Sequence, residues 1–414
     1  MGGGIIQLAA YGASDIYLTG NPQITFFKVV YRRHTNFSIE TVEQSFNGTP
    51  DFGRRTMCTI ARNGDLVSRM YLKVTLPALN QTQSGTDGTA TYQGYVNSIG
   101  NALIKSAEIK IGGQVIDKHY SEWMEIWSEL NIDNSLMDGY KEMVGKYDSN
   151  VSLETNATAE RTYYVPFMFW FCTNPGLAVP LIALQHHDVT VNMEFRDLTE
   201  LTKSDVTITT PQNSGGTVAS ITSATLYTDC IFLDVEERRR FAQKSHEYLI
   251  EQVQFSGTES ISASSENHIS TLNFNHPCKE LFWVITRDAN TAISTSTGND
   301  IFNFSAGGSD SFNTTQLLFN GMDRFVTQNA AYFRTVQPYN HHTRIPKKHL
   351  YTYSFSLRPE EHQPSGTCNM SRLDTVSMKF TFSSGILDSK LNVYTVNYNV
   401  LRVMSGMAGL AYSN

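Results

Sequence analysis

Short segments in which apolar and polar residues alternate make up most of the chain, and clusters of turn-forming residues separate them. Alternation with a period of two is typical of β-strands that bury one face, as in antiparallel sheets. The segments with this pattern are residues 65–77, 102–117, 162–171, 187–195, 224–235, 246–255, 268–274, 279–285, 315–321, 350–357, 374–382 and 391–403. The pattern therefore predicts an all-β protein.

One stretch, residues 121–145, has a helical period instead. Trp123, Ile126, Trp127 and Leu130 follow the spacing i, i+3, i+4 and i+7, which places them on one face of a helix. Three polar stretches between the predicted strands are long, and loops of this length in a compact β domain are usually functional or mobile. These exposed loops are predicted at residues 78–94, 199–217 and 288–313.

Two stretches nearly repeat each other: "IETVEQSFNGT" at 39–49 and "IEQVQFSGT" at 250–258. Other similar stretches follow in the same order, as expected of an internal repeat. The matched positions are Ile39 with Ile250, Gly113 with Gly321, Phe169 with Tyr353, Pro180 with Pro364, and Phe195 with Phe380, separated by 211, 208, 184, 184 and 185 residues. The separation changes once, by about 24 residues, in the interval that holds the predicted helix. This indicates a tandem duplication with one helical insertion in the first copy.

The repeat predicts two similar antiparallel domains. Eight strands with long connections suit a jelly roll, in which two sheets pack around one core. The sequence thus predicts two tandem eight-stranded antiparallel jelly rolls, with a short helical insertion in the first. We expect an N-terminal arm at 1–23, the first jelly roll at 24–235, a linker at 236–245 and the second jelly roll at 246–414.

The net charge and the fraction of charged residues indicate which kinds of partner the protein binds. The net charge is −7, whereas proteins that bind nucleic acid usually carry a basic excess, so no direct nucleic-acid contact is expected. The one dense basic run, "EERRRFAQK" at 236–244, is interpreted as a solvated helical or linker surface. Charged residues are only 17% of the chain, against roughly 25% in an average soluble domain. A surface of low charge suits a protein that remains in contact with neighbours.

The cysteines and the N-terminus indicate the cellular compartment in which the protein is expected. The chain has five cysteines, an odd number without CxxC spacing, so neither a disulfide framework nor a zinc site is predicted. We expect reduced, partly buried thiols in a cytosolic setting. The N-terminus lacks the basic start and apolar core of a signal peptide, and the longest apolar stretch, 165–172, is too short to span a bilayer.

Several long motifs carry a family resemblance. They are "LAAYGASDIYLTGNPQITFFKVVYRRHTNFSIE", "ARNGDL", "IGGQVIDKHY", "PGLAVPLIALQHH", "RRFAQKSHEYLIEQVQF", "QPSGTCNMSRLD" and "NYNVLRVMSGMAGLAY". In these motifs the chain resembles the major capsid proteins of large double-stranded DNA viruses of algae and protists, most closely the phycodnavirus type. The resemblance extends over nearly the whole chain and weakens in the three long polar loops.

The resemblance implies a double jelly roll that forms a homotrimer. Six similar barrels would then give a near-hexagonal capsomer that tiles an icosahedral shell through one repeated ring interface. It also implies neighbouring capsomers and minor capsid proteins as partners, and an N-terminal arm near the base, on the inner membrane side. The protein would be a virion component assembled in the host cytoplasm, with no catalytic site and no cofactor.

Other functions require patterns that the chain offers only in part. A metal enzyme on a jelly roll would need converging ligands, and the candidates are His186, His187 and Glu194, or His341 and His342. Adjacent residues on a strand point to opposite faces, so neither histidine pair could ligate a metal from one face. A catalytic triad can be drawn from distant positions and stays open, although no GxSxG elbow occurs.

A carbohydrate-binding, lectin-like β-sandwich is the alternative function. It would be favoured by exposed Trp or Tyr side chains gathered in one shallow groove. Glycosylation of the chain itself is a separate possibility, because sequons occur in or beside the expected exposed loops at Asn80, Asn303 and Asn313. The C-terminal "MSGMAGLAY" is interpreted as the end of a last strand whose tail packs between barrels or subunits.

Overall fold

The computed structural model describes residues 3–27, 32–147, 155–382 and 387–412. The chain forms two separate compact units, Met1–Phe37 and Ser38–Asn414. The helices of the first unit bury none of their residues; they are α1 (Gly3–Ala9), η1 (Ala13–Asp15) and α2 (Ile16–Thr19). None of the helices in the described ranges is both long and apolar enough to span a membrane.

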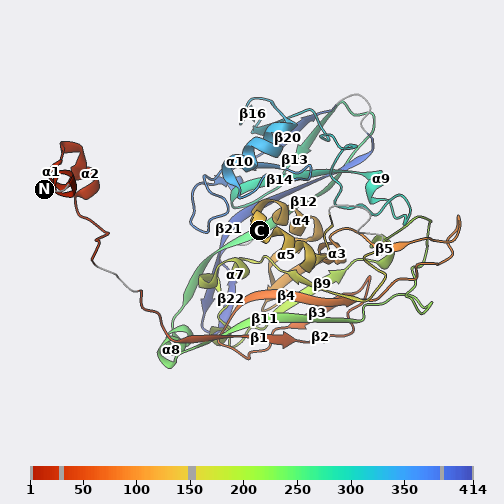
Figure 1. The fold of residues 1–414 in the computed structure, drawn as a ribbon, viewed down its shortest axis with the longest axis horizontal. Coiled ribbons are helices and arrows are strands. Elements are labelled where there is room, and N and C mark those ends of the chain that lie inside the picture. The colour runs from red at the N-terminus through yellow and green to blue at the C-terminus, as the bar shows by residue number, and fades with distance from the viewer. Residues whose placement is uncertain (1–2, 28–31, 148–154, 383–386, 413–414) are drawn as a thin grey trace. The chain divides into compact units, whose positions relative to one another are not determined.

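Two antiparallel sheets are built from strands that precede residue 235. Their strand orders are β1-β11-β4-β8 and β2-β3-β9-β6-β7, and β5 pairs separately with β10. The bounds are β1 (Phe37–Gln44), β2 (Phe46–Asn47), β3 (Arg55–Thr59), β4 (Leu66–Leu76), β5 (Gln93–Tyr95), β6 (Ile104–Ile111), β7 (Gln114–Tyr120), β8 (Arg161–Pro166), β9 (Val189–Phe195), β10 (Thr202–Ser204) and β11 (Ser223–Leu233). These strands, red to light green in Figure 1, form the part that we call the first half.

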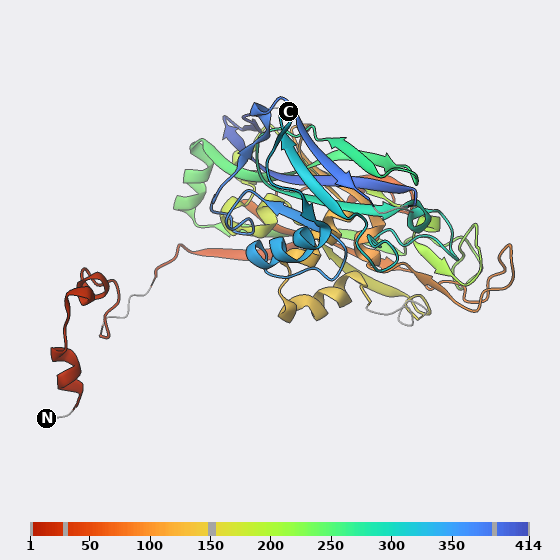
Figure 2. The same ribbon diagram turned by 90° about the horizontal axis from the view of Figure 1, so that it is seen from above.

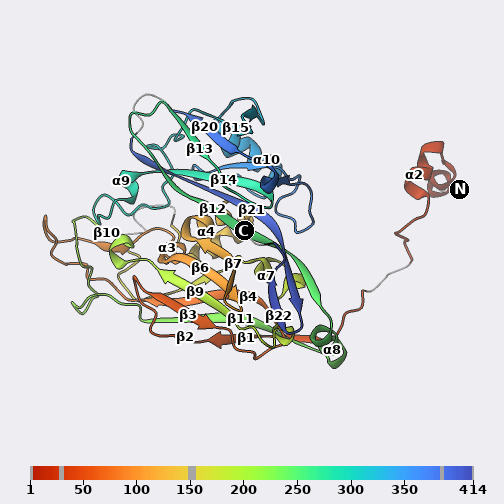
Figure 3. The same ribbon diagram turned by 180° about the vertical axis from the view of Figure 1, so that it is seen from behind.

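Two further sheets are built from strands that follow residue 245, in the part that we call the second half. Their orders are β12-β21-β14-β18 and β13-β20-β15-β16, with β17, β19 and β22 attached to them. The bounds are β12 (His246–Ile261), β13 (Asn267–Thr271), β14 (Pro277–Arg287), β15 (Thr314–Phe319), β16 (Met322–Asp323), β17 (Gln328–Asn329), β18 (Tyr351–Ser354), β19 (Cys368–Asn369), β20 (Val376–Thr381), β21 (Ser389–Met404) and β22 (Met407–Leu410). Figure 3 shows the halves side by side from behind.

The strand order confirms the duplication. Setting aside the short strands β2, β5 and β10, and likewise β17, β19 and β22, the described residues of each half form eight strands. Numbered along the chain, they form sheets of order 1-8-3-6 and 2-7-4-5 in both halves. Two sheets with these long crossovers make a jelly roll, so the predicted double jelly roll is the observed fold.

The matched glycines occupy corresponding turns. Gly48 and Gly257, which end the repeated stretch, have φ of +103° and +93°. Gly113 and Gly321, in the β6–β7 and β15–β16 turns, have φ of +84° and +80°. Residues with a side chain rarely adopt such angles, so both copies require glycine at these points. The repeated letters therefore correspond to a repeated backbone conformation.

The predicted helix at 121–145 is present but divided. It forms α4 (Ser121–Asn131) and α5 (Asn134–Val144), which lie between β7 and β8. The break arises because the Asp133 carboxylate accepts a hydrogen bond from the Ser135 amide at 2.7 Å, which begins a new helix. The remaining helices within the described ranges are α3 (Ile99–Leu103), α7 (Trp170–Thr173), η2 (Pro175–Leu177), η3 (Leu181–Ala183), η4 (Leu198–Glu200), α8 (Val235–Gln243), α9 (Asp288–Thr291), the π-helix η5 (Tyr332–Val336), α10 (Gln337–His341) and η6 (Met370–Arg372).

The strand predicted at 162–171 is wrong in its second part. The strand β8 ends at Pro166, and α7 begins at Trp170. Proline has no amide hydrogen for the ladder, which favours a strand end there. The proposed match of Phe169 with Tyr353 is displaced for the same reason, since Phe169 lies beyond β8 whereas Tyr353 lies within β18.

The strand β14 is buried on both faces, which joins the two halves. Leu281, Trp283 and Ile285 point into the core of the second jelly roll. Phe282 and Val284 belong instead to a hydrophobic cluster continuous with the core of the first half. A strand covered on both sides reads as an uninterrupted apolar run, as "LFWVI" does.

The three loops predicted to be exposed bind one another. The Gln83 side chain donates to the Thr210 carbonyl at 2.7 Å, and the Ser204 amide donates to the Thr295 carbonyl at 2.8 Å. Figure 2 shows loops of the first half projecting together at one end of the unit Ser38–Asn414. Phe302 and Phe304, in the third loop, are 4% and 1% exposed and belong to the core, so the expectation of full exposure is wrong for that segment.

Candidate functional site

The helical insertion of the first half lies against the outer face of the sheet β12-β21-β14-β18. The Trp123 ring of α4 meets Phe282 of β14 edge-on, with ring centroids 5.1 Å apart. The ring of Tyr120, at the end of β7, has its centroid 5.0 Å from that of Phe255 in β12. The Phe255 ring in turn stacks on Tyr394 of β21, with centroids 4.7 Å apart. Aromatic contacts of this kind add to the burial of apolar area, so the insertion fastens the two jelly rolls together.

A buried ionic network reinforces this junction. Glu125 and Glu129 of α4 are 0% and 2% exposed. Lys146 pairs with both of them, at 2.8 Å from Glu125. Two cations of the second half complete the network: Lys348 lies 2.7 Å from Glu125, and Arg344 lies 3.0 Å from Glu129.

The network determines the charge states of its members. Burial raises the pKa of Glu125, but the attraction of Lys146 and Lys348 is larger and holds it well below its usual value. Burial lowers the pKa of Lys146, but Glu125 and Glu129 outweigh this and raise it. Each charge is buried with partners, as a buried ion requires, and losing one partner would leave the others uncompensated.

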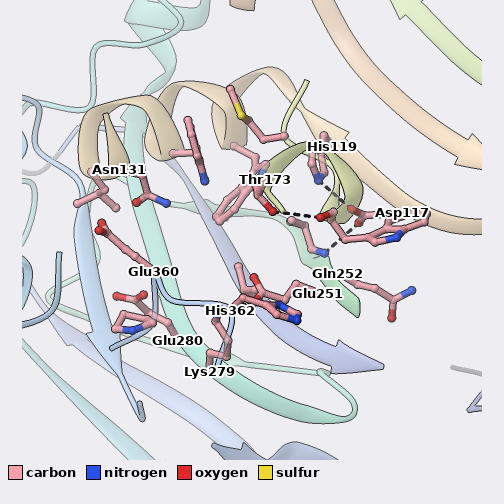
Figure 4. Close-up of a pocket in the computed structure, with 18 of the residues that line it drawn as sticks. Asp117, His119, Asn131, Thr173, Glu251, Gln252, Lys279, Glu280, Glu360 and His362 are labelled. Carbon is pink, nitrogen blue, oxygen red and sulfur yellow. Dashed lines mark hydrogen bonds and ion pairs between the residues drawn. The ribbon is translucent and has the colours of Figure 1, made fainter. Parts of the chain in front are cut away.

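A cavity of about 410 Å³ lies beside this junction, between the jelly rolls. Figure 4 shows polar side chains of both halves around it, including Asp117, His119, Glu280 and Glu360. Its main polar feature is His342, whose side chain is 2% exposed. The His342 Nε2 atom lies 2.6 Å from Glu280, and Nδ1 lies 2.9 Å from Glu360.

The two carboxylates keep His342 protonated. Burial lowers the pKa of the imidazole, but Glu280 and Glu360 more than compensate and raise it to about 9. Asn131 of α4 extends these contacts when its side-chain nitrogen is oriented toward Glu360. That nitrogen then donates to the Glu360 carboxylate at 3.1 Å, and the side-chain oxygen accepts from the Trp127 ring nitrogen at 2.8 Å. The contacts from Glu280 through His342 and Glu360 to Asn131 therefore connect β14 with α4, across the junction between the halves.

A second ion pair that contains a histidine, His119 with Asp117, lies where the same two halves meet. His119 Nε2 lies 2.9 Å from the Asp117 carboxylate, and both side chains are 1% exposed. Asp117 also accepts from the Val253 amide of β12 at 3.0 Å. Asp117 therefore holds β7 against β12, and both side chains also line the cavity, where the buried His119 Nδ1 atom has no hydrogen-bond partner among the described residues.

The structure separates the candidate metal ligands. His187 lies 3.0 Å from the Ala408 carbonyl, Glu194 forms ion pairs with Arg55 and Lys105, and His342 is held by two carboxylates. Within the described ranges, no three His, Cys, Asp or Glu side chains are grouped as metal ligands. The five cysteines are unpaired and buried or half-buried, and burial raises the pKa of Cys58 to about 11.

The aromatic side chains bear on the lectin-like alternative. Trp123, Trp170 and Trp283 are at most 3% exposed, and Trp127 is half-buried at the junction. Partly exposed tyrosines do gather, but on the outer face of the sheet β1-β11-β4-β8 rather than on a loop: Tyr71 stacks on Tyr227 at 5.3 Å and lies 6.2 Å from Tyr164.

The three sequons differ in exposure. Asn313 is exposed, whereas Asn80 and Asn303 are half-buried. The Asn303 amide donates to Asp300 at 3.2 Å and accepts from the Ser305 hydroxyl at 2.8 Å. Asn150, in another sequon, lies outside the described residues.

Sequence reasoning placed the insertion helix but missed the charges that it buries. Glu125 and Glu129 are spaced i, i+4 on α4 and each lies two residues after a tryptophan, which is the local signal of a charged inner face. Their partners Arg344 and Lys348 lie more than two hundred residues later, so nothing in the local pattern identifies them.

Comparison with known proteins agrees with this architecture. Residues 25–234 match the family described as the major capsid protein N-terminus, and residues 237–409 match the large eukaryotic DNA virus major capsid protein. The chain is 48% identical to the major capsid protein of Pyramimonas orientalis virus and 38% identical to that of Paramecium bursaria Chlorella virus 1, in each case over 100% of both chains.

A solved structure shares the fold across nearly the whole chain. PBCV-1 VP54, as fitted into a cryo-EM reconstruction of the virophage Sputnik, is 32% identical, with a TM-score of 0.79 over 94% of this chain and 100% of that one. Family, sequence and fold therefore agree. The chain belongs to the major capsid proteins of large eukaryotic DNA viruses.

Proposed function

We propose that the protein is the structural unit of an icosahedral virion shell and acts as a homotrimeric capsomer of near-hexagonal outline. The duplication carries this proposal: each chain supplies two jelly rolls of identical strand order, so three chains supply six similar corners. A closed ring needs only one kind of heterologous contact, repeated around the axis. Near-hexagonal blocks can then tile a flat facet.

The mass of the isolated protein tests the trimer. Light scattering on the purified chain should give three times 46.4 kDa. A stable monomer at micromolar concentration would contradict the proposal. Negative-stain images of the same sample should show a block with six lobes, whereas three lobes or an open chain of subunits would exclude the near-hexagonal outline.

We extend the proposal to the arm and the partners of the capsomer. Trimers would meet neighbouring capsomers and minor capsid proteins through their edges, with the arm toward the inner membrane side. Exposed apolar residues support a partner for the arm: Leu8 is 85% exposed and Tyr17 is 89% exposed. Removal of residues 1–23 should leave the trimer intact and abolish flotation with vesicles. Unchanged flotation would exclude the membrane-facing arm.

We also propose the division of the chain into arm 1–23, first jelly roll 24–235, linker 236–245 and second jelly roll 246–414. The sheets support it, because none of those described mixes strands from the two sides of residue 240. The helix α8 at this boundary buries none of its residues. Limited proteolysis within 236–245 should give two fragments that remain associated, whereas cleavage elsewhere first would argue against this boundary.

Two further features complete the proposal. Unpaired cysteines support assembly in the reducing host cytoplasm, and the net charge of −7 supports the absence of direct nucleic-acid contact. Among the three sequons, we propose Asn313 as the most accessible glycan acceptor, because it is the exposed one. Intact-protein mass spectrometry of virions, with an Asn313→Gln variant beside the natural chain, would detect the sugar or its absence.

A further inference from the structure

The internal repeat lets one observed contact predict an unobserved one. In the second half, the outer face of the sheet β12-β21-β14-β18 is covered by the first half, through Tyr120, Trp123 and the rest of α4. These covering residues come from the end of β7 and from the connection between β7 and β8. The contact therefore joins the connection of one jelly roll to the sheet of the next.

The equivalent sheet face of the first half is open. A separation of 209 residues, within the range of 208 to 211 found for the repeat, carries Tyr71 onto Glu280. Both residues lie on the third strand of the order 1-8-3-6 and pair with the eighth, Tyr71 with Tyr227 and Glu280 with Val396. Glu280 and Val396 line the cavity under α4, whereas Tyr71 and Tyr227 remain partly exposed.

This open face has the composition of an interface. Beside Tyr71, an apolar groove is lined by Tyr164, Met143, Met168 and Cys172, with Tyr164 and Met143 40% and 38% exposed. Tyrosine, methionine and arginine are enriched where proteins associate, and the groove also takes its lining from Arg69. The groove has a volume of about 460 Å³, enough to receive large side chains.

The second half carries the segment that corresponds to α4. Between β17 and β18 it forms η5 and α10, in the same topological position as α4 between β7 and β8. Two of its apolar side chains are left in solvent: Tyr339 is 76% exposed and Val336 is 42% exposed. Trp123 of α4, which covers the neighbouring sheet, is only 3% exposed.

We infer that the open face around Tyr71, Tyr164 and Tyr227 receives the 332–341 segment of a second copy of this chain, with Tyr339 entering the groove. This contact would repeat between chains what α4 forms within one. The sheet of each jelly roll would then be covered by the connection of its predecessor, and the ring would close without a free face. The inference rests on the proposed trimer and specifies which surfaces meet in it.

Charge reversal of the apolar contact tests the inference by light scattering. Tyr164→Glu on one surface and Tyr339→Glu on the other should each convert the trimer to monomer. The matched controls are Met57→Glu in β3 and Ile269→Glu in β13, at positions 42% and 63% exposed on the other sheet of each half. Both controls should stay trimeric. If Tyr164→Glu and Tyr339→Glu also remain trimeric, the inference fails while the proposed trimer stands.

Cross-linking gives a readout that does not depend on weakening the protein. Chains with Tyr164→Cys and chains with Tyr339→Cys, carrying different tags, are mixed during assembly and treated with a short bis-maleimide. All chains in this experiment also carry Cys172→Ser, because the Cys172 thiol lines the groove. Covalent dimers containing both tags should form only in the mixture, and neither single variant nor a Tyr339→Cys and Met57→Cys mixture should match their yield. Equal yields would overturn the assigned pairing. Failure of the natural chain to form trimers would instead refute the proposed function itself.

Discussion

Replacement of Arg344 by methionine measures how strongly the buried ionic network joins the two jelly rolls. The guanidinium lies 3.0 Å from the Glu129 carboxylate and donates to the Glu129 carbonyl at 2.9 Å, with side chains 7% and 3% exposed. Breaking a buried pair by removing one partner costs about 3–5 kcal/mol. Glu129 would keep Lys146 and the Lys347 amide, so we expect the lower end, about 3 kcal/mol.

A matched control isolates the effect of burial. Arg402 pairs with Glu247 at 2.8 Å, but the two side chains are 51% and 60% exposed. An exposed pair of this kind contributes about 0–1 kcal/mol, because water and salt screen it. Arg402→Met should therefore lower the free energy of unfolding by less than a third as much as Arg344→Met.

Urea unfolding followed by tryptophan fluorescence measures both variants, at one fixed protein concentration, because association also stabilises the fold. A double-mutant cycle with Glu129→Gln should give a coupling energy of about 1–3 kcal/mol with Arg344→Met, since the two residues are in contact. The reasoning is refuted if Arg344→Met costs no more than Arg402→Met, or if the cycle shows no coupling.

Three further predictions follow from individual residues. Because the folded pKa of His342 is about 9 and its ordinary value is 6.5, its ion pairs stabilise the fold fully below pH 6.5. That contribution, about 3 kcal/mol, is lost as the pH rises through 9, so unfolding free energies measured from pH 6 to 10 should fall less in His342→Gln than in the natural chain. Trp123→Ala should cost about 3–5 kcal/mol in urea unfolding, because the indole is buried against Phe282. Gly257→Ala should lower stability by roughly 1–2 kcal/mol through its φ of +93° alone, since an added methyl group meets no atom within 4 Å.

The repeat made the fold predictable from the sequence. Alternating segments gave strand positions, and matched residues such as Gly113 and Gly321 gave their correspondence, which the shared strand order confirms. The backbone angle at these glycines explains why the similarity between the two copies is still visible there. A turn that needs a positive φ restricts the residue type more than a packed surface does.

The features that were missed depend on contacts distant in sequence. Residues 301–304 read as a polar loop, yet Phe302 packs into the core, because the apolar surface available to it is supplied by the folded jelly rolls. The division of residues 121–145 depended on one capping aspartate. The partners of Glu125 and His342 belong to other elements of the chain, and no periodic pattern indicates such pairs.

The junction that α4 forms within the chain and the junction inferred between chains differ in the charge that they bury, and this difference lets folding precede assembly. Within the chain, α4 brings aromatic rings, Glu125 and Glu129 to the neighbouring jelly roll, and the charges are buried with partners on both sides. The corresponding segment at η5 and α10 is shorter and leaves Val336 and Tyr339 in solvent. A buried network of charges must form as the chain folds, because its members cannot remain unpaired. An apolar contact without buried charge can stay open in a folded subunit and close later, as an assembling shell requires.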